Sequence, residues 1–170
     1  MSLKILGAIL IIAGSGGVGY SMVLSHKREE DALKALICAI EFMISELKFR
    51  LTALPILCSM ASEQITGPVS GVLANLAELL ASQNAPDAGM CVEVALKNAV
   101  RLPDKTAGNI RRLGQSLGRF DLQGQLSGLQ AVAELTQRDL LGMQADRQMR
   151  IRAYTTLSLC AGVALVILFV

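Results

Sequence analysis

A glycine-rich segment near the start of the chain is the first candidate for chemistry. Gly14-Ser15-Gly16-Gly17-Val18-Gly19 matches the G-x-G-x-x-G pattern that binds the pyrophosphate of a dinucleotide. That site also needs a strand before the glycines and a second strand that ends in an acidic residue. A long amphipathic helical pattern follows Asp31 instead. Small residues such as Ser15, Gly16 and Gly19 let a second helix approach closely inside a membrane, and we favour this interpretation.

Other catalytic and metal-binding patterns are weak in this sequence. The single histidine, His26, argues against a zinc site and against Ser-His-Asp catalysis. The sequence has no G-x-x-x-x-G-K-[ST] phosphate loop. Glu41 and Glu46 lie near Lys48 and Arg50 in a helical pattern, which is typical of a solvated face. We therefore expect a protein that is not an enzyme and that holds no cofactor or metal.

Basic residues gather in one stretch of the chain. Residues 97–119 carry six bases against Asp104 alone, whereas residues 51–96 hold four acids and no base. Either neighbouring helices of opposite charge pair internally, or one cationic face binds an acidic partner or lipid headgroups. Nucleic acid is disfavoured because no aromatic residue is interleaved to stack a base. The six bases are Lys97, Arg101, Lys105, Arg111, Arg112 and Arg119.

Each end of the chain could cross a membrane. Residues 5–25 and residues 153–170 contain no charged side chain, and as helices they would reach about 31 and about 27 Å. A bilayer core is about 30 Å thick. Bases follow the first segment and precede the second, so the positive-inside rule places the middle in the cytoplasm. The expected parts are transmembrane helix 1–25, cytoplasmic bundle 26–152 and transmembrane helix 153–170. A cleaved signal peptide is the alternative for the first segment, and N-terminal sequencing would decide.

The middle of the chain has the periodicity of helices and no alternating strand pattern. Pro55, Gly67-Pro68, residues 84–89 and Pro103 divide it into successive helices. We therefore expect an all-α protein, an antiparallel helical bundle flanked by an N-terminal and a C-terminal transmembrane helix. The four cysteines form no Cys-x-x-Cys pair, and we expect them to be buried free thiols in a reducing compartment.

The first and last helices of the bundle are expected to be the longest and to lie together. Asp121 is placed to cap the last helix, which then continues without a breaker into the second apolar segment. The first helix carries an apolar stripe at steps of four and three. Its expected members are Leu33, Ile37, Ile40, Ile44, Leu47, Leu51 and Leu54.

Residues 113–125, LGQSLGRFDLQGQ, resemble the L-G-x-x-L-G-x-x-D-L-x-x-Q signature of the stage III sporulation protein AB family. The similarity covers the whole chain in length and layout, including residues 46–54 with Thr52 in place. Phe49 stands where the family has tyrosine, and the usual tryptophan is missing. We expect the turn to be structural, with Gly118 in a left-handed conformation and Asp121 as the cap. The matched signature residues are Leu113, Gly114, Leu117, Gly118, Asp121, Leu122 and Gln125.

The resemblance implies a component of the secretion-like channel between mother cell and forespore that endospore formation needs. Family members have a cytoplasmic helical domain similar to the platform protein of type II secretion and type IV pilus machines. The implied location is the mother-cell side, in the outer forespore membrane. The implied partners are a secretion-type ATPase and other proteins of the channel operon. The chain is also expected to contact membrane lipid and not to bind nucleic acid. Whether it self-associates is left open.

Two functions are therefore compared. The first is a non-enzymatic, membrane-anchored platform that docks partner proteins through its cytoplasmic bundle. The alternative is a small membrane-bound regulator or sensor in which the glycine segment or the cationic face binds a nucleotide or lipid ligand. Ligand binding that is lost when Gly16 and Gly19 are substituted would favour the alternative.

Overall fold

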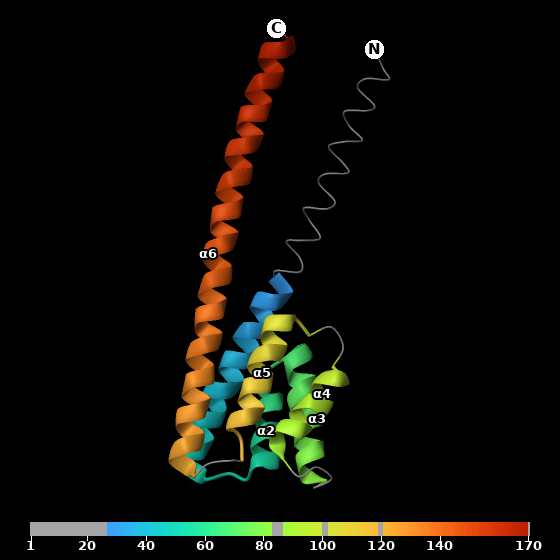
Figure 1. Cartoon of the computed structure of the whole chain (residues 1–170), viewed down its shortest axis with the longest axis vertical. Helices are drawn as coiled ribbons and strands as arrows, with labels where there is room; N and C mark the ends of the chain where they lie inside the picture. The colour runs from blue at the N-terminus through green and yellow to red at the C-terminus, as the bar shows by residue number, and fades with distance from the viewer. Residues whose placement is uncertain (1–26, 83–86, 100–101, 119–120, 170) are drawn as a thin grey trace.

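The structure is a computed structural model that describes residues 27–82, 87–99, 102–118 and 121–169. All secondary structure in these ranges is helical, as the sequence predicts, and it forms an antiparallel bundle from which the last helix extends (Figure 1). The predicted segment 1–25 lies outside the described residues. The helices are residues 27–50, α2 (Leu54–Glu63), α3 (Pro68–Ala81), α4 (Ala88–Lys97), α5 (Asp104–Ser116) and α6 (Leu122–Phe169).

Proline and glycine start two of the short helices where the sequence predicts new helices. α2 has Pro55 in its first turn, and α3 begins at Pro68 directly after Gly67. Proline suits a first turn because its missing N–H would have no helical partner there. Gly67 precedes α3 with a φ of +92°, in the region that favours glycine.

The first long helix ends earlier than its apolar stripe predicts. It stops at residue 50, and Leu51 then takes a φ of +51° with its side chain 67% exposed. Leu54 already belongs to α2. The expectation that Leu51 and Leu54 continue this helix was therefore wrong, since the chain turns sharply between them.

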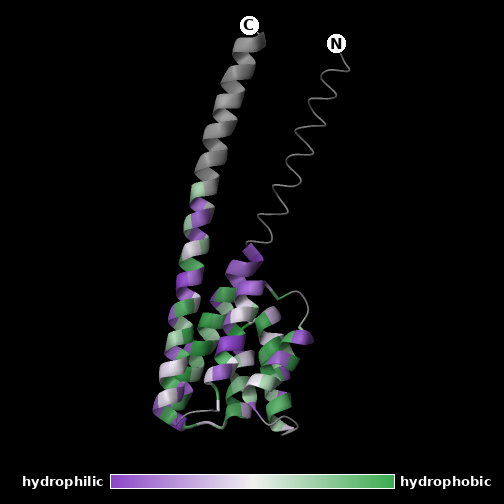
Figure 2. Cartoon of the chain, in the orientation of Figure 1, coloured by the Kyte–Doolittle hydropathy of each residue, from purple (hydrophilic) through white to green (hydrophobic). Residues whose placement is uncertain are grey.

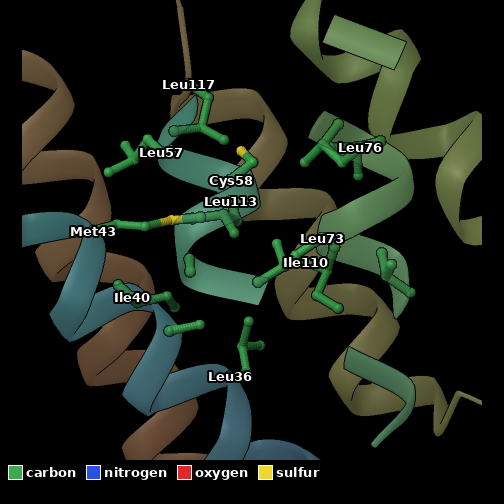
Figure 3. Packing of buried hydrophobic residues seen from close by; sticks show 14 of the residues in the cluster. Leu36, Ile40, Met43, Leu57, Cys58, Leu73, Leu76, Ile110, Leu113 and Leu117 are labelled. Carbon is green, nitrogen blue, oxygen red and sulfur yellow. The ribbon is translucent and has the colours of Figure 1, made fainter. Parts of the chain in front are cut away.

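The buried face of this helix is also rotated from the predicted stripe. Ile37 and Ile44 are only half-buried, whereas Leu36 and Met43 are completely buried. Figure 3 shows Leu36, Ile40 and Met43 on one side of the helix, among core residues of the other helices. The buried residues Leu33, Leu36, Ile40, Met43 and Leu47 also recur at steps of three and four, so the helical period is as expected and only the face differs. Leu36 and Ile37 are both apolar, as are Met43 and Ile44, so the pattern alone does not decide which of each pair points inward.

α6 lies antiparallel to the first long helix. Gln144 of α6 donates from Nε2 to Glu30 Oε1 at 3.2 Å, so the middle of α6 lies beside the start of the other helix. Leu126 and Leu129 near the beginning of α6 join the same core as Leu47 near the other helix's end. α6 is continuous for 48 residues, about 72 Å, which confirms the predicted unbroken rod.

Within the described part of the chain, no helix is long and apolar enough to span a membrane. The backbone of α6 includes residues 153–169, whose side chains lie outside the description.

The described cysteines are free, but they are not all buried. Cys58 and Cys91 lie in the core, and burial raises the pKa of the Cys58 thiol to about 12. Cys38 is exposed on the first long helix, so the expectation of a buried thiol was wrong there. Helical periodicity did not indicate this, because a small, weakly polar residue fits either face of a helix.

Candidate functional site

The signature stretch runs from the end of α5 into the start of α6 and packs against α4, and its first leucines belong to the core. Leu113 and Leu117 are both fully buried, and Figure 3 shows them among residues of α2 and α3. Gly114 allows α4 and α5 to approach closely. A Cβ added to it would lie 2.5 Å from Val92 Cγ2 and 2.8 Å from Val92 Cβ. Any side chain at this position would therefore push the two helices apart.

The second half of the signature makes the turn from α5 to α6. α5 ends at Ser116, Leu117 is extended, and Gly118 has a φ of +76°. A Cβ on Gly118 would find room, its nearest neighbour being Ala88 Cβ at 3.8 Å, so the backbone angle is what requires glycine. Asp121 then caps α6, because its Oδ1 accepts the backbone N–H of Gly124 at 3.0 Å.

Two signature residues lie outside this core. Leu122, the first residue of α6, is 41% exposed. Leu122 precedes Leu126, the first residue of α6 that belongs to the core, by about one helical turn. Gln125 is half-buried, and its backbone N–H donates to the carbonyl oxygen of Asp121.

Replacing the cap should destabilise the chain measurably. Asp121→Ala leaves the Gly124 N–H without its acceptor, so the free energy of unfolding should fall by about 0.5–2 kcal/mol. Asp121→Asn keeps an accepting oxygen and should change stability little. Thermal unfolding of both purified variants measures this. Equal melting of Asp121→Ala and the parent would show that the carboxylate does not cap the helix in solution.

A second close helix contact was not predicted from the sequence. A Cβ on Gly128 of α6 would lie 2.7 Å from Ser116 Cβ of α5. About two turns before Ser116 on α5, Asn109 Nδ2 donates to Asp139 Oδ2 at 2.9 Å, and this bond joins the same pair of helices. The available signal was the pair Gly124 and Gly128, four residues apart on one helix. α5 thus contacts α6 through small and polar residues.

The described bases of the cationic stretch, residues 97–119, are of two kinds: Arg111 pairs with an acid of the bundle, and the others are exposed. Arg111 forms two hydrogen bonds with Glu93 of α4, one of them from Nη2 to Oε2 at 3.2 Å. These bonds, with the attraction between the charges, lower the pKa of the Glu93 carboxyl and raise that of the Arg111 guanidinium. The internal-pairing alternative therefore holds for Arg111.

The other described bases are exposed. The side chains of Lys97, Lys105 and Arg112 form no ion pair or hydrogen bond with any described residue. The charge of Lys97 nevertheless helps to lower the pKa of the Glu93 carboxyl. Because Arg111 faces α4 and Asn109 faces α6, a turn of 100° per residue places Arg112 on the α6 side of α5. Lys105, seven residues earlier, shares that side. Arg101 and Arg119 lie outside the described residues, as do Ser15, Gly16 and Gly19.

An open cavity of about 780 Å³ lies between the start of the first long helix and the α2–α3 connection. Its charged lining is Arg28, Asp31 and Lys34, and Lys34 pairs with Glu30 at 2.7 Å. The opposite charges balance, so the cavity offers no strong attraction for a phosphate. Among the described residues, no group of three or more His, Cys, Asp or Glu side chains could hold a metal ion.

The fold and the signature turn together define a helical bundle organised by a structural motif at the α5–α6 turn. The family model of stage III sporulation protein AB matches residues 4–170, so the chain belongs to that family. A solved structure titled stage III sporulation protein AB has the same fold, with a TM-score of 0.63 at 17% identity. The match covers 72% of this chain and 98% of that one. No curated protein matches the sequence.

Proposed function

We propose that the chain is a non-enzymatic platform of the secretion-like channel between mother cell and forespore. In this proposal residues 5–25 and 153–170 anchor it in the outer forespore membrane, and the bundle docks partner proteins on the mother-cell side. Membership in the stage III sporulation protein AB family supports the sporulation role. The expected partners are a secretion-type ATPase and the other proteins of the channel operon.

One observation carries this proposal: residue 27, to which the first apolar segment is joined, lies at the same end of the bundle from which α6 extends. The first long helix begins beside the middle of α6, where Glu30 accepts a hydrogen bond from Gln144. α6 continues past that level to Phe169, while residue 27 begins the other helix (Figure 1). Two membrane anchors attached in this way would hold the bundle upright on one face of a bilayer.

Charge at this end agrees with the proposed orientation. Figure 2 shows hydrophilic residues along the first turn of the 27–50 helix, where Lys27 and Arg28 are exposed. Basic residues next to an apolar segment favour the cytoplasmic side of a membrane. Lys105 and Arg112, exposed on the α6 side of α5, are the part of the cationic stretch that we propose for binding an acidic partner.

Cys38 provides a native probe of this topology. It is exposed, whereas Cys58 and Cys91 are buried, and the raised pKa of Cys58 keeps its thiol protonated and unreactive. A membrane-impermeant maleimide added to intact cells should leave Cys38 unlabelled and should label it once the membrane is permeabilised. Cys38→Ser is the matched control and should remove the signal, because the remaining cysteine, Cys160, lies within the proposed membrane anchor 153–170.

Two results would contradict the proposed anchoring. Labelling of Cys38 in intact cells would place the bundle outside the cytoplasm. A released soluble form that is shorter by about 25 residues at its N-terminus would show that the first segment is a cleaved signal peptide.

A further inference from the structure

Four large apolar residues are exposed on segments that meet at one end of the bundle. We define the end patch as Phe49, Leu51, Ile56 and Leu122. They are half of the eight large hydrophobic residues that are exposed in the described ranges, and Phe49 is 83% and Ile56 57% exposed. The other four are distributed along α4 and α6, as Met90, Val94, Leu141 and Met149. An exposed apolar cluster of this kind marks an interaction site more often than a single exposed residue does.

The end patch is built from chain segments that meet at the end opposite to the start of the 27–50 helix. They are the last turn of that helix, the connection to α2, the first turn of α2 and the first residue of α6 (Figure 1). Thr52 Oγ1 donates to Glu46 Oε2 at 3.3 Å, which holds the connection against the helix. A Cβ on Gly118 would lie 3.9 Å from Leu54 Cδ2, so the α5–α6 turn borders the same region.

Leu51 holds an unfavourable backbone conformation without burying its side chain. Its φ of +51° is uncommon for a residue with a Cβ, and it is the one non-glycine residue with positive φ in the described ranges. Such a conformation is usually offset by packing, yet this side chain is 67% exposed. Contact with another molecule would supply the missing burial.

Positive charge borders the patch. Lys48 and Arg50 flank Phe49 in the sequence; Lys48 is exposed, and the Arg50 side chain is 71% exposed with only a 4.0 Å contact to Glu46. The acids of these segments are Asp121, which is exposed and caps α6, and Glu46, whose side chain is only 15% exposed and accepts the hydrogen bond from Thr52. The exposed bases of the described segments therefore outnumber the exposed acids. A segment that carries both apolar and acidic residues would complement this surface. A second copy that met it end to end would bring like charges together.

We propose that the end patch binds an apolar, acidic segment of a cytoplasmic partner protein. This rests on the proposed topology in one respect, since the membrane anchors then lie at the far end of the bundle and leave the patch free. Burial of Phe49, Leu51 and Ile56 would supply the apolar contact, and Lys48 and Arg50 would select acidic partners.

Site-specific photocrosslinking in sporulating cells tests this on the intact chain. The photoreactive residue p-benzoylphenylalanine replaces Phe49 in one strain and Met90, an exposed apolar residue of α4, in the control strain. Mass spectrometry identifies the crosslinked segment. Position 49 should crosslink at least tenfold more strongly than position 90, to a segment of another protein with net negative charge. Lys48→Glu with Arg50→Glu should reduce that crosslink at least tenfold while thermal unfolding stays unchanged.

Several outcomes would overturn the proposal that the end patch binds an acidic segment of a partner protein. They are crosslinks from position 49 to a second copy of this chain, crosslinks to lipid alone, and a yield no greater than that from position 90. The same holds if the crosslink persists in the charge-reversed variant. Labelling of Cys38 from outside the cell would instead contradict the proposed platform topology, so the two failures are distinguishable.

Discussion

Gly114→Ala should be less stable than Gly108→Ala by about 1–3 kcal/mol in free energy of unfolding. Both glycines lie inside α5, so both substitutions gain the same helix propensity, about 1 kcal/mol. A Cβ at Gly108 meets nothing within 4 Å, whereas a Cβ at Gly114 meets Val92 at 2.5 Å. The difference between the two variants therefore isolates the clash between α4 and α5.

Thermal or denaturant unfolding of the purified chain measures both variants. Gly108→Ala should unfold at or above the parent's midpoint. Val92→Ala removes the methyl at 2.5 Å but keeps the Cβ at 2.8 Å, so it should partly relieve Gly114→Ala in the double variant. Equal stability of the two alanine variants would show that α4 and α5 do not approach this closely.

Leu113→Ala should lower the free energy of unfolding by about 2–5 kcal/mol, because it removes a fully buried side chain from the centre of the core. Leu122→Ala, at another leucine of the same signature, should cost less than about 1 kcal/mol, since that side chain is 41% exposed. Chemical denaturation of both variants checks the contrast. Similar losses at both positions would mean that the start of α6 is more deeply packed than the structure describes.

The all-helical fold and the starts of α2, α3 and α6 follow from local signals in the sequence. Proline and glycine act through their own backbones, and the Asp121 cap reaches only three residues along the chain. Such features need no knowledge of the tertiary fold. The turn at Gly118 belongs to this group, since its positive φ is the property that distinguishes glycine from other residues.

The departures from prediction arise from contacts between distant residues. Arg111 pairs with Glu93, 18 residues earlier on another helix, and a charge count cannot distinguish that from an exposed face. Leu51 continues an apolar stripe in sequence, but its left-handed conformation is not indicated by its residue type. The same holds for Gly128, whose closeness to Ser116 depends on how α5 and α6 pack.

Recovery of the intact protein from detergent-solubilised membranes of sporulating cells tests the proposed platform most directly. The parent chain should co-purify with a secretion-type ATPase and other membrane proteins of the channel operon. Lys105→Glu with Arg112→Glu should fold normally but recover less of these partners. Recovery with the parent chain should itself fall as salt rises, because salt screens the attraction, so the difference between parent and variant should be largest at low salt. Recovery of the parent protein alone, from cells whose sporulation depends on it, would contradict a docking platform.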